Sequence, residues 1–396
     1  MNETKTKIFG QHDDATIRQI DTCVAAGGER GVLCADGHKG YAQPIGGVVA
    51  YKDKISVSGV GFDIACGNLA IRTDATLSQV APAIETIMDD VVRDISFGVG
   101  RSSKTRIDHE LFDDEAWQLK PMRDLKATAA DQLGTVGGGN HYVDIFADED
   151  DRIWVGVHFG SRGLGHKIAT YFLKAAGGKD GMDVPPTVVP DSSELGVTYL
   201  AGMHLGGRYA YAGREAVARH VVRGILGARS VEEVHNHHNF AWRETQLIDN
   251  EPREVVVVRK GATPAFAGQK SFVGGSMGDN AVIIEGVDSP TSRDALFSTV
   301  HGAGRIMSRT QAKGKFVKVN GKRIRQDGLV RHDEMLKWIR ERGVALRGGD
   351  VDEAPQAYRR LPDVLAAHEG TIRILHTLRP IGVAMAGKEI VDPYKD

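Results

Sequence analysis

The chain has 396 residues, of which 41% are apolar, and this length can bury a sizeable core. Its formal charge is −2 with no block of like charge, so a polyanion would have to bind at a local basic site rather than through bulk electrostatics. The absence of both a run of about 18 apolar residues and a signal-peptide core favours a cytoplasmic protein without a membrane segment. Three cysteines, Cys23, Cys34 and Cys66, argue against a disulfide framework.

The predicted strands are short and lie between glycine turns. In chain order they cover residues 31–35, 45–51, 69–72, 141–146, 153–158, 255–258, 281–285, 372–375 and 381–385. They alternate with helices irregularly, without the rhythm of βαβ units. This pattern predicts a mixed α+β architecture in a single domain that spans residues 1–396.

One helix is marked by its apolar stripe. Thr76 can serve as its N-cap, and six apolar residues between Ile84 and Ile95 recur at helical spacing. Further helices are expected at residues 167–175, 209–225 and 333–341, and surface loops at residues 176–193 and 320–328.

Glycine is the outlier of the composition, with 48 residues or about 12% against a usual ~7%. It accompanies potential metal ligands or nucleophiles in five segments, residues 36–40, 61–67, 137–141, 157–163 and 301–305. A sixth segment, residues 235–239, holds three histidines. A single histidine is usually an ordinary core or surface residue, so it is the combination of these segments that indicates a functional site.

The side chains in these segments are typical of a transition-metal site. Asp63 and Cys66 stand three residues apart in a glycine-bounded turn, so a carboxylate and a thiolate can converge on one point. His141 and His158 each lie at the end of a predicted strand. Such a mixture of ligands suits Mn²⁺, Zn²⁺ or Co²⁺ rather than Ca²⁺, and Cys66 could bridge two ions.

The glycines also indicate a phosphate ligand, because a backbone without Cβ atoms can approach phosphate oxygens and aim N–H groups at them. Neither the P-loop fingerprint nor a dinucleotide-binding loop is present. The phosphates would then be held by a metal together with Arg162, Arg305 and Lys39, whose alternative role is an ordinary surface ion pair.

Several motifs occur in order along the chain: Asp36-Gly37-His38 with Pro44-Ile45-Gly46-Gly47, Gly61-Phe62-Asp63 with Cys66-Gly67, Gly139-Asn140-His141, His158 with Gly160-Ser161-Arg162-Gly163, His238-Asn239, Gly275-Ser276-Met277-Gly278, His301-Gly302-Ala303-Gly304-Arg305, and Asp352-Glu353-Ala354-Pro355 with Ala357-Tyr358. Through them the chain resembles the RtcB family of RNA-splicing ligases, from about Gly31 to Gly387. The resemblance implies an RtcB-type fold with mixed β-sheets surrounded by helices. It also implies a ligase dependent on GTP and Mn²⁺ that joins an RNA 3′-phosphate or 2′,3′-cyclic phosphate to a 5′-hydroxyl.

The resemblance further implies residue roles. Asp63, Cys66 and His141 would hold one Mn²⁺, and Cys66, His158 and His238 a second. His301 would attack the α-phosphate of GTP with support from Asp36, and Arg162 and Arg305 would bind RNA phosphates. The guanylate contacts would be Asn140, His141, Asp144, His238, Asn239, Gly275, Ser276, Met277, His301, Gly302, Ala303 and Gly304. The expected partner is RNA with these ends; an activating protein of the archease type is left open, and a monomer is expected.

Three positions depart from the family pattern. Asp144 stands where the family commonly has Glu. The family keeps a serine near the position of Ala281, and it ends in Lys-Gly where this chain reads Gly387-Lys388.

Two alternatives come from other functional classes. A dinuclear metal phosphatase or cyclic phosphodiesterase would need the metals but no GTP. A non-catalytic RNA-binding protein fits poorly with a near-neutral charge and 6% aromatic residues. A ligase with a lysine nucleophile is disfavoured, because the nearest approach to its motif is Arg325-Gln326-Asp327-Gly328 and an always-protonated arginine cannot attack phosphorus.

Overall fold

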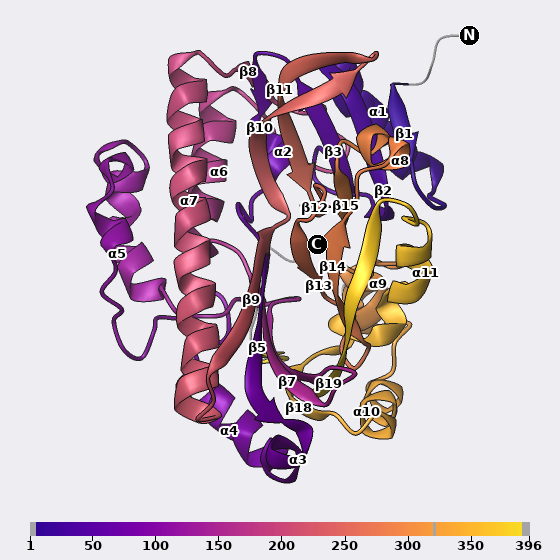
Figure 1. The fold of residues 1–396 in the computed structure, drawn as a ribbon. Helices are drawn as coiled ribbons and strands as arrows, with labels where there is room; N and C mark the ends of the chain where they lie inside the picture. Colours follow the sequence, from indigo (N-terminus) through magenta and orange to yellow (C-terminus); the bar gives the residue numbers. More distant parts are fainter. Residues whose placement is uncertain (1–4, 320–321, 390–396) are drawn as a thin grey trace.

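Two β-sheets form the frame of the molecule in the computed structural model, which describes residues 5–319 and 322–389 (Figure 1). The smaller of the two has five strands in the order β1-β2-β3-β11-β10. Their bounds are β1 (Thr6–Ile8), β2 (Gly28–His38), β3 (Ile45–Tyr51), β11 (Glu251–Lys260) and β10 (Asn239–Ile248).

The larger sheet has eight strands, seven of them in the order β13-β14-β19-β6-β7-β5-β9, with β18 paired to β19. The strands are β13 (Lys270–Val273), β14 (Ala281–Gly286), β19 (Ile372–Gly387), β6 (Tyr142–Ala147), β7 (Arg152–Phe159), β5 (Gly67–Thr76), β9 (Ser230–His237) and β18 (Ala345–Gly349). The β6-β7-β5-β9 part is antiparallel throughout. The starts of β5 and β6 and the ends of β7 and β9 therefore meet at one edge of the sheet.

Three short strand pairs complete the β-structure: β12 (Ala262–Pro264) with β15 (Ser298–Val300), β4 (Lys54–Ser56) with β8 (Val188–Pro190), and β16 (Gly314–Val319) with β17 (Lys322–Asp327). The chain passes from one main sheet to the other at His238, which is the single residue between β9 and β10. The position of His238 therefore depends on how the two sheets are placed relative to each other.

Helices cover the outside of the sheets. Figure 1 shows the long α7 (Glu194–Arg219) beside α6 (Arg162–Ala175), with α5 (Met122–Gln132) outermost on that side. The other helices are α1 (Asp14–Ala25), α2 (Val57–Val60), α3 (Leu77–Val80), α4 (Ile84–Asp94), α8 (Pro290–Asp294), α9 (Arg309–Lys313), α10 (His332–Glu341) and α11 (Leu361–Ala366). Within the described part of the chain, no helix combines the length and the apolar character needed to cross a bilayer.

The largest apolar core lies between α6, α7 and the five-stranded sheet. It includes Phe172 of α6, Met203 of α7 and Val258 of β11, each at most 1% exposed. A glycine also brings α7 close to the end of β7: a Cβ on Gly213 would lie 3.2 Å from the ring of Phe159, which belongs to another apolar cluster. The helix therefore packs directly behind the sheet edge where the candidate ligands lie.

The structure confirms the α+β class and the positions of most predicted strands, with three corrections. Residues 372–375 and 381–385 belong to one strand, β19, whose register shifts near Pro380 because proline has no N–H for the ladder. Residues 322–327 of the expected loop form β17, while Asn320 and Gly321 lie outside the described residues. The expected loop at residues 176–193 contains β8.

The predicted helix after Thr76 is also corrected. Thr76 caps only the short α3, in a capping box with Gln79, and α4 begins at Ile84 after a 3-10 turn that contains Pro82. Met88 and Val91 of the apolar stripe are buried, but Val92 is 36% exposed. The helix expected at residues 209–225 is the second half of α7 followed by a π-helical turn, His220–Ile225.

Candidate metal centre

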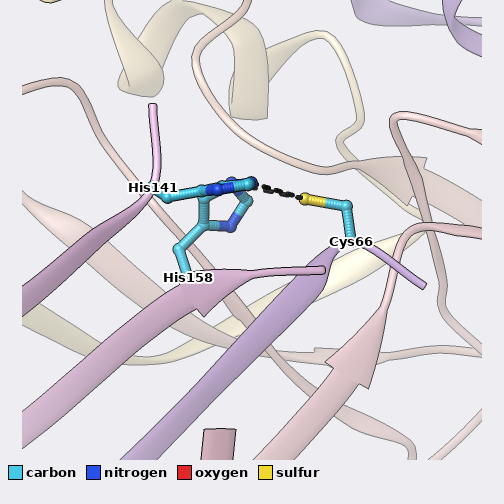
Figure 2. A group of neighbouring side chains, drawn as sticks. All are labelled: Cys66, His141 and His158. Carbon is cyan, nitrogen blue, oxygen red and sulfur yellow. Dashed lines mark hydrogen bonds between the residues drawn. The ribbon is translucent and has the colours of Figure 1, made fainter. Parts of the chain in front are cut away.

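Cys66, His141 and His158 converge at the edge of the large sheet (Figure 2). Cys66 directly precedes β5, His141 directly precedes β6, and His158 is the penultimate residue of β7. The Sγ atom of Cys66 lies 3.7 Å from the Nε2 atoms of both histidines. The three donor atoms lie within 4.8 Å of one another, so this group could hold a metal ion.

The backbone around Cys66 fixes where its thiol points. Its N–H donates to the carbonyl of Asp63 (3.1 Å), and its carbonyl accepts from the N–H of His238 (2.8 Å). A Cβ on Gly67 would lie 2.2 Å from the carbonyl oxygen of Asn236, so only glycine allows β5 to approach β9 this closely. Burial raises the pKa of the Cys66 thiol, and the Asp63 carboxylate raises it further. A bound cation would reverse that effect, because a coordinating thiol is deprotonated.

Asp63 joins this group through His141. Its Oδ2 atom lies 3.0 Å from Nε2 of His141. Burial works against ionisation of Asp63, but the hydrogen bond and charge interaction with His141 bring its pKa below the usual value. A Cβ on Gly160 would lie 2.0 Å from Oδ1 of Asp63, so the glycine after β7 leaves the space that this carboxylate occupies.

His158 is oriented by Asn68, a residue to which the sequence analysis gave no role. These residues face each other across β5 and β7, and Nδ1 of His158 lies 2.6 Å from Oδ1 of Asn68. The amide nitrogen of Asn68 donates to the carbonyl of Phe272 (2.8 Å), which fixes the amide and assigns the proton of His158 to Nδ1. Nε2 therefore offers its lone pair towards Cys66. Burial holds the pKa of His158 far below its usual value, so the ring is neutral, as a metal ligand must be.

His238 lies between this group and His301. Its ring centroid is 5.2 Å from that of His158 and 5.0 Å from that of His301. Its Nδ1 atom is buried and has no hydrogen-bond partner among the described residues. Burial lowers its pKa well below the usual range, so this ring is also neutral. Buried polar atoms usually have a hydrogen-bond partner, so a buried imidazole nitrogen without one is a candidate for binding a ligand.

His301 follows β15 and is held by Asp36 of β2. Oδ2 of this fully buried carboxylate accepts from the backbone N–H of His301 (2.9 Å) and the N–H of Gly302 (3.3 Å), and lies 2.6 Å from ring Nδ1 of His301. Burial opposes ionisation of Asp36, but the contacts with His301 lower its pKa below the usual value. A Cβ on Gly304 would lie 2.2 Å from the carbonyl oxygen of Asp36, so this close approach requires glycine. Asp36 engages Nδ1 of His301, and Nε2 has no hydrogen bond to any residue that the structure describes.

A cavity of about 750 Å³ opens beside these groups. It is lined by most of the residues predicted to bind metal or guanylate: Asp63, Cys66, Asn140, Asp144, His158, His238, Asn239, Gly275, Ser276, Met277, His301, Gly302, Ala303 and Gly304. Asp36 and His141 do not line the cavity themselves. Asp36 contacts the lining residue His301, and His141 contacts the lining residue Asp63. Burial raises the pKa of Asp144, whose Oδ1 atom, like the hydroxyl of Tyr142, is buried with no partner among the described residues.

The two arginines predicted to bind RNA phosphates are engaged within the protein. Arg162 does not line the cavity; it donates to the hydroxyl of Thr135 (3.1 Å) and the carbonyl of Gly98 (2.9 Å). Arg305 lines the cavity and donates to the hydroxyl of Tyr358 (2.9 Å) and the carbonyl of Asp352 (2.7 Å). Both guanidinium groups are therefore hydrogen-bonded to other residues of the protein.

Further cationic side chains lie at the cavity: Arg309, which had no predicted role, and Lys39, a candidate phosphate contact. Arg309 lines it and pairs with Asp352 and Glu353, two members of a motif whose role the sequence left open. Lys39 lines it as well and forms an ion pair with Asp183. Of the departures from the family pattern, Asp144 lines the cavity, whereas Ala281 is buried in β14 and Lys388 is exposed beyond β19.

The thiol and the two imidazoles lie beside a cavity of about 750 Å³ and could hold a metal ion there. The family model described as tRNA-splicing ligase RtcB matches residues 22–122 and 114–386. The tRNA-splicing ligase RtcB of Thermococcus kodakarensis is 30% identical over 433 aligned positions, which cover 89% of this chain and 87% of that protein. The chain belongs to the RtcB family of tRNA-splicing ligases.

Bacterial and eukaryotic relatives match over a similar extent. RNA-splicing ligase RtcB1 of Escherichia coli is 30% identical over 380 positions, which cover 87% of each chain. RNA-splicing ligase RtcB homolog 1 of Entamoeba histolytica is 28% identical over 462 positions, which cover 96% of this chain and 85% of that protein.

Proposed function

We propose that this protein is an RNA ligase that uses GTP and Mn²⁺ to join a 3′-phosphate or 2′,3′-cyclic phosphate end to a 5′-hydroxyl end, in tRNA splicing or RNA repair. The observation that carries the proposal is the free Nε2 atom of His301, whose Nδ1 is held by Asp36 beside the thiol–imidazole group. We further propose that residues 1–396 act as one catalytic domain, as a cytoplasmic monomer, with an archease-type protein as activating partner.

His301 is the proposed nucleophile. Because Asp36 fixes the proton on Nδ1, the lone pair of Nε2 can form a bond to the α-phosphorus of GTP while the bond to pyrophosphate breaks. The buried carboxylate then stabilises the positive charge that develops on the ring. The GMP next passes from His301 to the RNA 3′-phosphate, and the 5′-hydroxyl displaces GMP from the resulting anhydride to form the new phosphodiester bond.

The ligands present fit two Mn²⁺ ions. Asp63, Cys66 and His141 would hold one ion, and Cys66, His158 and His238 the other. The orphaned Nδ1 of His238 and the fixed Nε2 of His158 support this assignment. When bound, such ions neutralise the negative charge that develops on phosphate oxygens.

The cavity fits a nucleotide beside this centre. Its volume lies in the range of small-molecule sites, and glycines at positions 275, 302 and 304 let the backbone approach phosphates. The buried Asp144 Oδ1 and Tyr142 hydroxyl would find partners in a bound ligand. We therefore keep the guanylate contacts named above, from Asn140 to Gly304, as proposals. Arg162 and Arg305 remain the proposed contacts of RNA phosphates.

The test combines a labelling and a joining assay. Protein incubated with Mn²⁺ and α-labelled GTP should acquire a label that is labile in acid and stable in base, and His301→Ala should stay unlabelled. An RNA pair with 3′-phosphate and 5′-hydroxyl ends should be joined only when GTP is present. Equal labelling of the mutant would reject His301, and phosphate release without GTP would identify a hydrolase instead.

A further inference from the structure

We propose that Arg214 is a positioning residue of the metal centre: its buried guanidinium clamps the two carbonyl groups next to Cys66 and His158 and so fixes where these ligands point. The inference rests on the metal centre of the proposed function. It concerns a residue of α7 that lies behind the sheet edge and does not line the cavity.

The contacts of Arg214 lead directly to the two ligands. Its Nη1 atom donates to the carbonyl oxygen of Ala65 (3.0 Å) and to that of Phe159 (2.5 Å). Ala65 immediately precedes Cys66, and Phe159 immediately follows His158. One planar group therefore joins the turn before β5 to the end of β7, which carry the thiolate and one imidazole.

The other side of the guanidinium is held by two histidines that are not among the proposed ligands. Nε of Arg214 donates to Nε2 of His235 (2.8 Å), and Nη2 lies 3.0 Å from Nδ1 of His237. Burial, followed by the charge of Arg214, lowers the pKa of both histidines well below the usual value, so both rings are neutral acceptors. Tyr211 lies against both rings, with centroid distances of 4.0 Å, and fixes their orientation.

The burial of Arg214 needs a compensating charge. Its exposed fraction is 0%, and none of the ion pairs formed by the described residues includes it. A buried cation without a counter-ion is costly. The negative groups that stabilise it include the carboxylates of Asp63 and Glu215, and the Cys66 sulfur would join them once a bound metal deprotonates it. Ligands of the centre would thus serve as counter-ions of the group that positions them.

Arg259 supplies a matched control. It is also 0% exposed, but it pairs with Glu244 and donates to Ser298, and it does not line the cavity. Substitution at this position tests the cost of losing a buried guanidinium that does not contact the metal ligands.

The experiment titrates metal-free protein with Co²⁺ and follows the absorption band that arises from a thiolate–Co²⁺ bond. Arg214→Met and Arg214→Lys should both bind Co²⁺ at least about 10-fold more weakly and with a shifted band, because neither side chain can replace the planar fork. Arg259→Met should lose thermal stability and keep the wild-type band and affinity. His235→Ala, which removes only one acceptor of Arg214, should weaken Co²⁺ binding by a smaller factor.

The outcomes separate the two proposals. If folded variants at Arg214 and His235 keep the wild-type band and affinity, the positioning role is overturned while the metal centre stands. If Arg214→Met does not fold, His235→Ala decides by the same criterion. A wild-type protein without a thiolate–Co²⁺ band removes the metal centre itself and the role of Arg214 with it.

Discussion

One carboxylate oxygen of Asp36 contacts both the ring nitrogen Nδ1 and the backbone N–H of His301. Ring Nδ1 lies 2.6 Å and backbone N 2.9 Å from Oδ2, although the two residues are 265 positions apart in the chain. The side chain and the main chain of His301 are therefore fixed together, and Nε2 has a single orientation towards the cavity.

The first prediction concerns this pair. Asp36→Asn keeps the size of the side chain but removes the negative charge that stabilises a charged imidazole, and its amide can present an N–H to Nδ1. We expect transfer of GMP to His301 to fall by roughly 10²–10⁴-fold, as when a catalytic histidine loses its carboxylate partner. Single-turnover labelling with α-labelled GTP measures this rate. Metal content should not change, and a rate within about threefold of wild type would contradict the role of Asp36.

The second prediction separates the two ions. Cys66 lies 3.7 Å from both His141 and His158, whereas His238 lies against His158 and His301. Cys66→Ala should therefore lose both Mn²⁺ ions, and His238→Ala should weaken mainly one. Native mass spectrometry at increasing Mn²⁺ counts the ions per chain. An identical loss of both ions in the two variants would show that Cys66 has no special bridging position.

The third prediction concerns Asn68, which holds the ring of His158. Asn68→Ala frees Nδ1, so the ring can rotate and change its tautomer; metal affinity should fall by about 10–100-fold. Isothermal titration with Mn²⁺ measures the affinity. Asn236→Ala is a close control. Asn236 pairs with Asn68 across β5 and β9, and its side chain accepts from the backbone N–H of Phe272 rather than contacting a metal ligand. Equal losses in both variants would assign the effect to packing.

The fourth prediction concerns pH and stability. His368 is fully buried, stacks on Phe9 and accepts from the N–H of Ala35, and burial lowers its pKa to about 4. Below about pH 6.5 the unfolded chain gains a proton on this residue that the folded protein binds only near pH 4. The free energy of unfolding should thus fall as the pH drops through this window, by up to about 3 kcal/mol from His368.

Urea unfolding of metal-free protein between pH 7 and pH 4.5 measures this effect. His368→Gln should flatten the pH dependence, because glutamine can accept the same hydrogen bond and does not titrate. His332→Gln, at an exposed position in α10, should follow the wild-type curve. Parallel curves for His368→Gln and wild type would show that His368 does not cause the loss.

The parts of the site that sequence could reveal are those in which residue type alone is informative. A thiol, a carboxylate and several imidazoles beside glycines indicate metal chemistry. His141 and His158 were predicted to lie at strand ends, and they lie directly before β6 and near the end of β7. Asn68 could not be found in this way. A single asparagine within a strand gains meaning only from the register that sets it opposite His158.

Arg214 and Arg305 show the same limit. An arginine within a helix usually lies at the surface, and only the packing of α7 against the sheet buries Arg214. Arg305 was predicted to bind an RNA phosphate, with an ordinary ion pair as its alternative role. Its contact with Tyr358, 53 residues away, could not be predicted, because no local pattern indicates it. In the fold, the strands predicted at residues 372–375 and 381–385 are one strand, β19, because a register shift lets the strand continue past Pro380.

The position of His238 between β9 and β10 has a mechanical consequence. An ion bound both by this histidine and by residues at the ends of β5 and β7 would cross-link the two sheets at the point where they meet. Movement of one sheet against the other would then require metal–ligand bonds to break. Metal binding would therefore increase the resistance of the whole protein to proteolysis.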